Sequence, residues 1–357
     1  MNQVMLKDIV SQPEALKDGL GRLREQVGEL QFGSVRRVIL TGSGDSYIAA
    51  LAVEDLVRYR FSGDVSAMPS LDASRYLQHE QGDLVVVVSV SGEVARTIEV
   101  AERASRSGAS TIAITCNASS TLSLGCDHQL VMPEPIDRSI PHSRDYTATL
   151  LALTVLAEKL GGETFPELDA WVSVVESVIA NAFDVLEEMV WDRERWWFLG
   201  AGPDRVTAMF GALKFWEAAG MEAWWDDLEE FAHGSQLMAR PGDYAVLIAA
   251  GAGVARAHEM VSGLRRMGMK PLLIGSSEMK GTDCLYLPSH DDLADPIWHP
   301  FVSCIPLQVL TYLEADARHL DVSVPLFGRP HGPAYDAVHV EWTKQSEIWV
   351  GGDHRAS

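Results

Sequence analysis

An internal repeat constrains the fold of this chain more than any other feature of its sequence. Three stretches of the first half recur in the second at one constant offset of 160 residues: Gly82–Val86 as Gly242–Val246, Val94–Arg96 as Val254–Arg256, and Gly108 as Gly268. A Gly-x-Gly turn follows an apolar run in each half, at Gly42–Gly44 and at Gly200–Gly202. A constant offset over such a span predicts two tandem copies of one domain.

Each copy has the pattern strand, glycine turn, helix, strand, turn, helix, strand. Three short runs rich in β-branched residues, Val38–Leu40, Leu84–Val90 and Thr111–Thr115, are typical of buried parallel strands. Ser46–Tyr59 and Ala95–Ser107 have helical periodicity. Alternating strands and helices predict right-handed crossovers, so we expect an α/β fold of two tandem, doubly wound parallel-sheet domains of flavodoxin-like type.

The length of 357 residues and the 47% hydrophobic content suffice for two hydrophobic cores. We expect a helical lead-in over residues 1–30, a first sheet domain over 31–165 and a second over 166–330. Residues 331–357 are expected to form a C-terminal tail near the active site.

The charge of the chain excludes several classes of partner. A formal net charge of −21 argues against nucleic acid and against an anionic membrane surface, since both require a basic face. The start of the chain does not resemble a signal peptide and the apolar runs are too short to span a bilayer, so we expect a cytoplasmic protein. The four cysteines, Cys116, Cys126, Cys284 and Cys304, lack metal-binding spacing and are expected to be reduced, with no metal or other cofactor.

Two serine-containing turns are the candidate anion site. Ser43, Gly44, Asp45 and Ser46 lie between a strand and a helix, and Ser89, Val90 and Ser91 end the next buried strand. Ligands of doubly wound sheets bind at the carboxyl ends of the strands, where glycines and helix amides favour an anion. Two hydroxyls at i and i+2 of a strand point to the same side, so Ser89 and Ser91 are expected to converge with Ser46. The alternative is that these serines only cap helices.

The second copy of the repeat serves as a control for this alternative. Ser89 and Ser91 of the first copy correspond to Ala249 and Gly251 of the second. Maintenance of the fold alone does not require that difference. The asymmetry therefore favours an anion site in the first copy only.

At these residues the chain resembles the SIS (sugar isomerase) family, in particular the isomerase half of glutamine–fructose-6-phosphate amidotransferase and its single-chain double-SIS relatives. The resemblance is carried by short motifs in a fixed order: Met5–Ile9 with Gln12-Pro13, Gly44–Tyr47, Ser89–Glu93, Gly211–Lys214 with Glu217, His233-Gly234, and Ile305–Gln308. It implies that Ser46, Ser89 and Ser91 hold a sugar phosphate. Ser143 and Lys214 complete the candidate substrate-binding residues.

The chain departs from the family pattern in three places. The glutaminase domain and its N-terminal cysteine are absent, so glutamine-dependent activity is not expected. Val94 stands where the family has a threonine beside the phosphate, which leaves the identity of the anion open. Asp336 stands where the amidotransferase has a lysine that forms a Schiff base, and Lys344 is a distant substitute for that lysine.

A helical stripe carries the candidate catalytic carboxylate. Val206, Phe210, Leu213 and Gly220 share one apolar face with Glu217. A carboxylate on such a face is costly unless it is paired or used in catalysis, and Lys214, three residues earlier, is a possible partner. From the residues alone both interpretations stand. The resemblance implies that Glu217 transfers a proton between C1 and C2 of the sugar.

His233 would alone be interpreted as a hydrogen-bonded loop or core histidine. The resemblance implies instead that it opens the sugar ring from the neighbouring subunit of a homodimer. Tryptophans cluster in the second copy and should mostly be core or interface residues, while Trp216 or Trp224, which flank Glu217, could stack on a sugar face.

Two functions remain open from the sequence. The first is an enzyme that acts at C1–C2 of a phosphorylated ketose or amino sugar, as an isomerase, a deaminase or a deglycase of fructosamine phosphates. The second is a non-catalytic regulatory protein that binds a sugar phosphate. Retention of Glu217 and His233 favours the enzyme.

Overall fold

The computed structural model describes residues 3–133, 141–187, 195–275, 284–286, 293–322 and 332–344. The chain divides into two compact units, each built around one parallel sheet. The first-sheet unit comprises Gly21–Glu134, Val155–Gly162 and Phe327–Ser357. The second-sheet unit comprises Met1–Leu20, Pro135–Thr154 and Glu163–Leu326.

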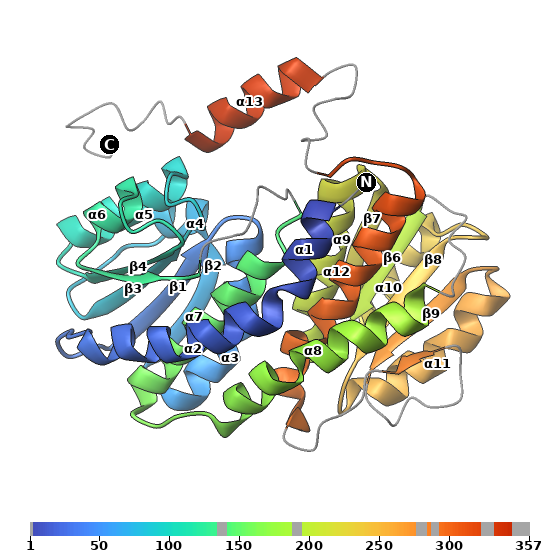
Figure 1. Ribbon diagram of the computed structural model, residues 1–357, viewed down its shortest axis with the longest axis horizontal. Helices are drawn as coiled ribbons and strands as arrows, with labels where there is room; N and C mark the ends of the chain where they lie inside the picture. Colours follow the sequence, from blue (N-terminus) through green and yellow to red (C-terminus); the bar gives the residue numbers. More distant parts are fainter. Residues whose placement is uncertain are drawn as a thin grey trace. The chain divides into compact units, whose positions relative to one another are not determined.

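The first sheet has five parallel strands in the order β2-β1-β3-β4-β5 (Figure 1). These strands are β1 (Arg37–Gly42), β2 (Asp64–Pro69), β3 (Asp83–Val88), β4 (Ser110–Thr115) and β5 (His128–Val131). The helices of this unit are α3 (Asp45–Arg60), α4 (Ser70–Arg75), α5 (Ala95–Arg106), α6 (Thr121–Gly125), α13 (Gly332–Lys344) and parts of α2 (Gln12–Glu29) and α7 (Arg144–Gly161). Every residue of β3 is buried, as expected for a parallel strand covered by helices on both faces.

The second sheet repeats this order as β7-β6-β8-β9-β10. Its strands are β6 (Arg195–Gly200), β7 (Glu222–Asp227), β8 (Tyr244–Ala249), β9 (Lys270–Gly275) and β10 (Cys284–Tyr286). The helices of the unit include α1 (Gln3–Val10), α8 (Pro166–Leu186), α9 (Arg205–Ala219), α10 (Leu228–His233), α11 (Gly253–Arg266) and α12 (His299–Ala317). Trp197, Leu247 and Leu273 belong to a core that includes α11 residues.

Backbone geometry repeats with the sequence. The paired glycines Gly82 and Gly242 have φ angles of 93° and 91°, and Gly108 and Gly268 have φ angles of 78° and 79°. An equivalent arginine–aspartate pair also occurs in each sheet. Arg37 at the start of β1 donates from Nε to Asp83 at the start of β3, at 3.0 Å. Arg195 at the start of β6 donates from Nε to Asp243, the residue before β8, at 3.1 Å. Both sheets are doubly wound, and the predicted fold class is confirmed.

The strand order reverses direction at one place in each sheet. This topological switch point lies between β1 and β3 in the first sheet and between β6 and β8 in the second. Ligands of open α/β sheets bind beside the carboxyl ends of the strands at such points. Ser46 follows β1 and Ser89 follows β3, so the predicted anion residues lie at the switch point of the first sheet.

Two sequence expectations about individual elements were wrong. The strand expected over Leu84–Val90 ends at Val88, because Gly92 N turns back to donate to Ser89 O at 3.0 Å. Ser89 and Ser91 therefore belong to a turn, and the i, i+2 argument of an extended strand does not apply to them. Gly220 does not extend the stripe of α9, since it terminates that helix with left-handed angles of φ 55° and ψ 35°.

Within the described ranges, no helix is both long enough and apolar enough to cross a membrane.

Candidate functional site

Three serines at the first switch point have hydroxyls that can donate to an anion. Ser46 and Ser89 are buried, with 7% and 3% of their surface exposed, whereas Ser91 is exposed. Ser89 Oγ accepts from Gly92 N, and Ser91 Oγ accepts from Glu93 N, each at 3.2 Å. A hydroxyl that accepts a hydrogen bond keeps its own proton for another acceptor.

The turn that carries Ser89 and Ser91 is held tightly. Gly92 has a φ of 68°, and a Cβ at this position would lie 2.1 Å from Ser120 Oγ, so only glycine fits. Glu93 accepts hydrogen bonds from Thr121 N and Thr121 Oγ1, both at 2.8 Å, and so anchors the far side of the turn. Val90 O accepts from Cys116 N at 3.0 Å.

The two helices that begin at this switch point have no side-chain cap. Gly44 is the N-cap of α3 and Val94 the N-cap of α5, and neither provides a side-chain acceptor. Their first amides and helix dipoles therefore favour an external anion. Val94 replaces the family threonine without supplying its hydroxyl. Asp45 is the first residue of α3, and Ser43 Oγ lies 2.5 Å from Ser70 Oγ.

A lysine of the same unit lies beside these serines. Lys344, the last residue of α13, places its Nζ 3.4 Å from Ser91 Oγ. The sequence analysis considered Lys344 only as a distant substitute for the family lysine and did not predict its contact with Ser91. The side chain of Asp336, at the position of the family lysine, is outside the part of the chain that the structure describes.

The second switch point is filled by side chains of its own unit. Counting from the matched glycine turns, Asp204 occupies the position of Ser46, and it is 1% exposed at the N-cap of α9. Its Oδ1 is 2.6 Å from His299 Nδ1 and accepts from Ser303 Oγ at 3.2 Å. A Cβ on Gly251 would lie 2.4 Å from Pro296 Cγ. This helix start already has its own anion, and Pro296 covers the adjacent turn.

Glu217 lies on α9 of the second-sheet unit and is paired with Lys214. Lys214 Nζ donates to Glu217 Oε2 at 2.5 Å and to His142 O at 3.3 Å, and it lies 5.2 Å from the centre of the Phe210 ring. The side chain of Lys214 is 0% exposed and that of Glu217 is 23% exposed. The more deeply buried charge is therefore the lysine, because Glu217 lies near the end of the helix. A buried ammonium requires an anionic partner.

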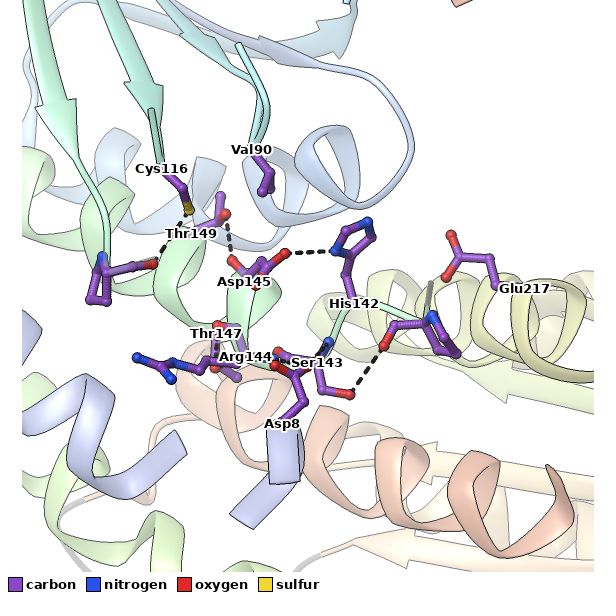
Figure 2. A network of polar contacts seen from close by, with 12 residues as sticks. Asp8, Val90, Cys116, His142, Ser143, Arg144, Asp145, Thr147, Thr149 and Glu217 are labelled. Atoms are coloured by element: carbon purple, nitrogen blue, oxygen red, sulfur yellow. Dashed lines mark hydrogen bonds and ion pairs between the residues drawn. The ribbon is translucent and has the colours of Figure 1, made fainter. Parts of the chain in front are cut away.

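The segment Pro141–Asp145 leads into α7 and is fixed by contacts from distant parts of the same unit (Figure 2). Asp8 Oδ2 accepts from Ser143 N and Arg144 N, both at 3.0 Å. Gln308 Nε2 donates to Ser143 O at 3.3 Å. Burial raises the pKa of Asp8, against the two amide donors, which lower it. Ser143 is thus a buried anchor, with its amide and carbonyl both engaged.

A histidine–aspartate pair lies in the same segment. His142 Nδ1 is 2.6 Å from Asp145 Oδ2, and the exposed fractions of the two side chains are 43% and 2%. Sequence reasoning missed this pair and Asp8. The i, i+3 spacing of His142 and Asp145 at a helix start was a weak signal for the first, while no local pattern connects Asp8 with residues about 135 positions away.

His233 ends α10 and is 69% exposed in the single chain, with Nε2 3.2 Å from Glu229 Oε1. The tryptophans near Glu217 have internal partners. Trp224 stacks on Trp197 with ring centres 4.9 Å apart, and Trp216 Nε1 donates to Ala223 O at 2.9 Å.

The described residues contain no group of three or more His, Cys, Asp or Glu side chains arranged to hold a metal ion. Among the residues that the structure describes, Cys116, Cys126 and Cys304 are not joined in disulfide bonds. Burial raises the pKa of Cys126 to about 12, which keeps its thiol protonated.

These two units define a class of protein by its fold: an α/β protein with two doubly wound parallel sheets. Residues 31–159 match the model of the SIS domain family. Over 345 residues it is 26% identical to the isomerizing glutamine–fructose-6-phosphate aminotransferase of Thermococcus kodakarensis, a match that covers 90% of this chain and 56% of that protein. The chain thus spans about half the length of the curated relatives it matches. The predicted resemblance to the isomerase half of these enzymes is confirmed.

Solved structures show the same fold. Glucosamine-6-phosphate deaminase of Thermotoga maritima superposes with a TM-score of 0.77 at 20% identity, covering 92% of this chain and 97% of that chain. Tagatose-6-phosphate ketose/aldose isomerase of Escherichia coli superposes with a TM-score of 0.74 at 20% identity, covering 90% and 95% of the two chains.

Proposed function

We propose that this protein binds a phosphorylated ketose or amino sugar and transfers a proton between C1 and C2 of that sugar. The fold and the family support a phosphosugar-binding protein of isomerase or deaminase type. The finer assignment rests on the residues described above.

The observation that carries the proposal is the state of Glu217. A base that moves a proton between neighbouring carbons must be ionised, held in one place and accessible to substrate. Lys214 satisfies the first two conditions, since its buried ammonium contacts Glu217 Oε2 at 2.5 Å. The 23% exposure of the Glu217 side chain supports the third.

The first switch point is the proposed binding site for the phosphate. Its uncapped helix starts and three serine hydroxyls are donors for an anion, and Lys344 brings a cation to Ser91. The second switch point already contains the carboxylate of Asp204. The proposed site is therefore confined to the first copy.

His233 is proposed to assist ring opening from the partner chain of a homodimer. Its 69% exposure supports a role outside its own chain, because the ring is not enclosed by its own unit.

A two-stage experiment tests the proposal. A thermal-shift screen with fructose 6-phosphate, glucosamine 6-phosphate and inorganic phosphate identifies binding, since a ligand that binds only the folded state raises its stability. NMR in deuterated water then measures exchange of the C1 and C2 hydrogens of each sugar that binds. Binding with exchange is the expected result. Binding without exchange would instead support a non-catalytic sugar-phosphate-binding protein.

A further inference from the structure

The His142–Asp145 pair shares its surroundings with the proposed base. Lys214 Nζ donates both to the backbone oxygen of His142 and to the carboxylate of Glu217, so one buried ammonium connects the two residues. In the view of Figure 2, the imidazole of His142 and the carboxylate of Glu217 both extend upward from their backbones. The two side chains are also both partly exposed, by 43% and 23%.

Asp145 fixes the imidazole in one orientation. Its carboxylate is 2% exposed, and Thr149 Oγ1 donates to Asp145 O at 2.7 Å within α7. A buried carboxylate 2.6 Å from Nδ1 favours the tautomer with a proton on Nδ1 and stabilises the imidazolium when Nε2 is protonated. Together with the anchoring of Ser143 and Arg144 by Asp8, this gives a positioned acid–base group.

The charged groups around His142 indicate which reaction step this residue can assist. The segment around His142 is contacted by the carboxylates of Asp8 and Asp145, and the carboxylate of Glu217 pairs with the ammonium of Lys214. The guanidinium of Arg144 points away from His142 in Figure 2. The imbalance favours one more positive charge, which an imidazolium or a substrate ammonium group supplies.

We propose that His142 is a second acid–base residue, positioned by Asp145, and that it serves the departure of an amine nitrogen carried on C1 or C2 of the sugar phosphate. This proposal rests on the proposed function and extends it. A single base can transfer the proton between C1 and C2. Release of an amine also requires a group that takes a proton from the attacking water and gives a proton to the amine nitrogen.

The added steps follow the proton transfer by Glu217, which converts the amine-bearing sugar into an iminium ion. Water adds to the iminium carbon, and His142 takes the proton that the water loses. The imidazolium then protonates the nitrogen of the carbinolamine. The C–N bond breaks with its electron pair leaving on nitrogen, and the hydroxyl loses its proton to His142 as the carbonyl forms. His142 then gives this proton to the released amine and returns to the neutral imidazole. The net change is iminium plus water to carbonyl plus protonated amine.

Two measured partial reactions test this assignment. The probes are glucosamine 6-phosphate, with its amine on C2, and a 1-alkylamino-1-deoxyfructose 6-phosphate, with its amine on C1. Exchange of the C1 and C2 hydrogens in deuterated water reports Glu217, and amine release reports His142. His142→Asn should retain exchange within about threefold and release amine at least about 100-fold more slowly. Added imidazole should restore part of the release in His142→Ala.

Asp145→Asn is the companion variant for the positioning role. Because the amide still accepts from Nδ1 but no longer stabilises the imidazolium, amine release should fall by less than in His142→Asn, again with exchange retained. A merely structural role would lower both partial reactions together.

The outcomes separate this inference from the function on which it rests. Wild-type protein that exchanges hydrogen but releases no amine from either probe overturns the role of His142 alone. The same holds if His142→Asn releases amine at the wild-type rate or loses both reactions equally. Wild-type protein that exchanges hydrogen with no sugar phosphate overturns the proposed function, and the role of His142 with it.

Discussion

Glu217→Gln distinguishes a catalytic carboxylate from a structural ion pair. The substitution keeps the shape of the side chain and leaves an amide oxygen to accept from Lys214 Nζ, so it removes a charge rather than a hydrogen bond. A hydrogen bond to a charged group contributes about 1.5–3 kcal/mol and a neutral one about 0.5–1.5 kcal/mol. We therefore expect a loss of about 1–2 kcal/mol in the free energy of unfolding. The loss should be smaller than the 3–5 kcal/mol of a fully buried pair, since Glu217 is 23% exposed.

Such a loss leaves a domain of ordinary stability folded. Urea unfolding measures it, and NMR in deuterated water measures exchange of the sugar hydrogens, which should fall by at least about 100-fold. Glu314→Gln is the matched control. Glu314 lies on α12 of the same unit, is 2% exposed and pairs with Arg318 at 2.9 Å. It should lower stability to a similar extent and leave exchange unchanged. Exchange that persists in Glu217→Gln, or that falls equally in both variants, would refute the catalytic assignment.

Three further predictions concern the anion site and the partner chain. Replacing Ser89 and Ser91 with alanine should weaken sugar-phosphate binding, measured by calorimetry, by about 1–3 kcal/mol for each hydrogen bond lost to the charged phosphate, and unchanged affinity in the double variant would contradict the site. Borohydride added with substrate should give no covalent adduct in intact-mass spectra, because Asp336 replaces the family lysine; an adduct at Lys344 would show that the lysine beside Ser91 has taken over that role. His233→Ala should slow turnover of cyclic substrate more than turnover of an open-chain analogue. Subunit exchange between His233→Ala and inactive Glu217→Gln should restore part of the activity, and a fully active monomer would contradict a site shared between two chains.

The repeat made most of the fold predictable. Because the same glycines recur at one offset, the strand order of either sheet follows from the other, and the left-handed turns at Gly108 and Gly268 agree within one degree. The strands β1, β3 and β4 were found because buried parallel strands are almost continuously apolar. Strand β7 was missed, since its Glu222–Asp227 segment mixes tryptophans with three acidic residues.

The candidate site was less predictable because its contacts are distant in sequence. The pairing of Lys214 with Glu217 could be anticipated from their spacing on one helix, although not which charge would be the more buried. Asp8 lies on a helix near the N-terminus, 135 residues before Ser143, and the hydrophobic periodicity of the sequence does not predict a contact between them. The turn at Ser89 was misjudged because the apolar run continues through Val90, while Gly92 closes the turn two residues later.

One of the differences between the two copies bears directly on the proposed anion site. At the helix start after the first strand, Ser46 in one copy is replaced by Asp204 in the other. The dipole of α9 is then satisfied by a carboxylate that is itself bound to His299, so a phosphate at that position would meet a like charge. The helix start of α3 has the hydroxyl of Ser46 at this position, next to Asp45, the first residue of the helix. Freed from anion binding, α9 can carry the Lys214–Glu217 pair near its other end. Replacing Ser46 by Asp should therefore abolish phosphate binding and leave the fold intact, since α9 of the second copy forms with Asp204 at the corresponding position.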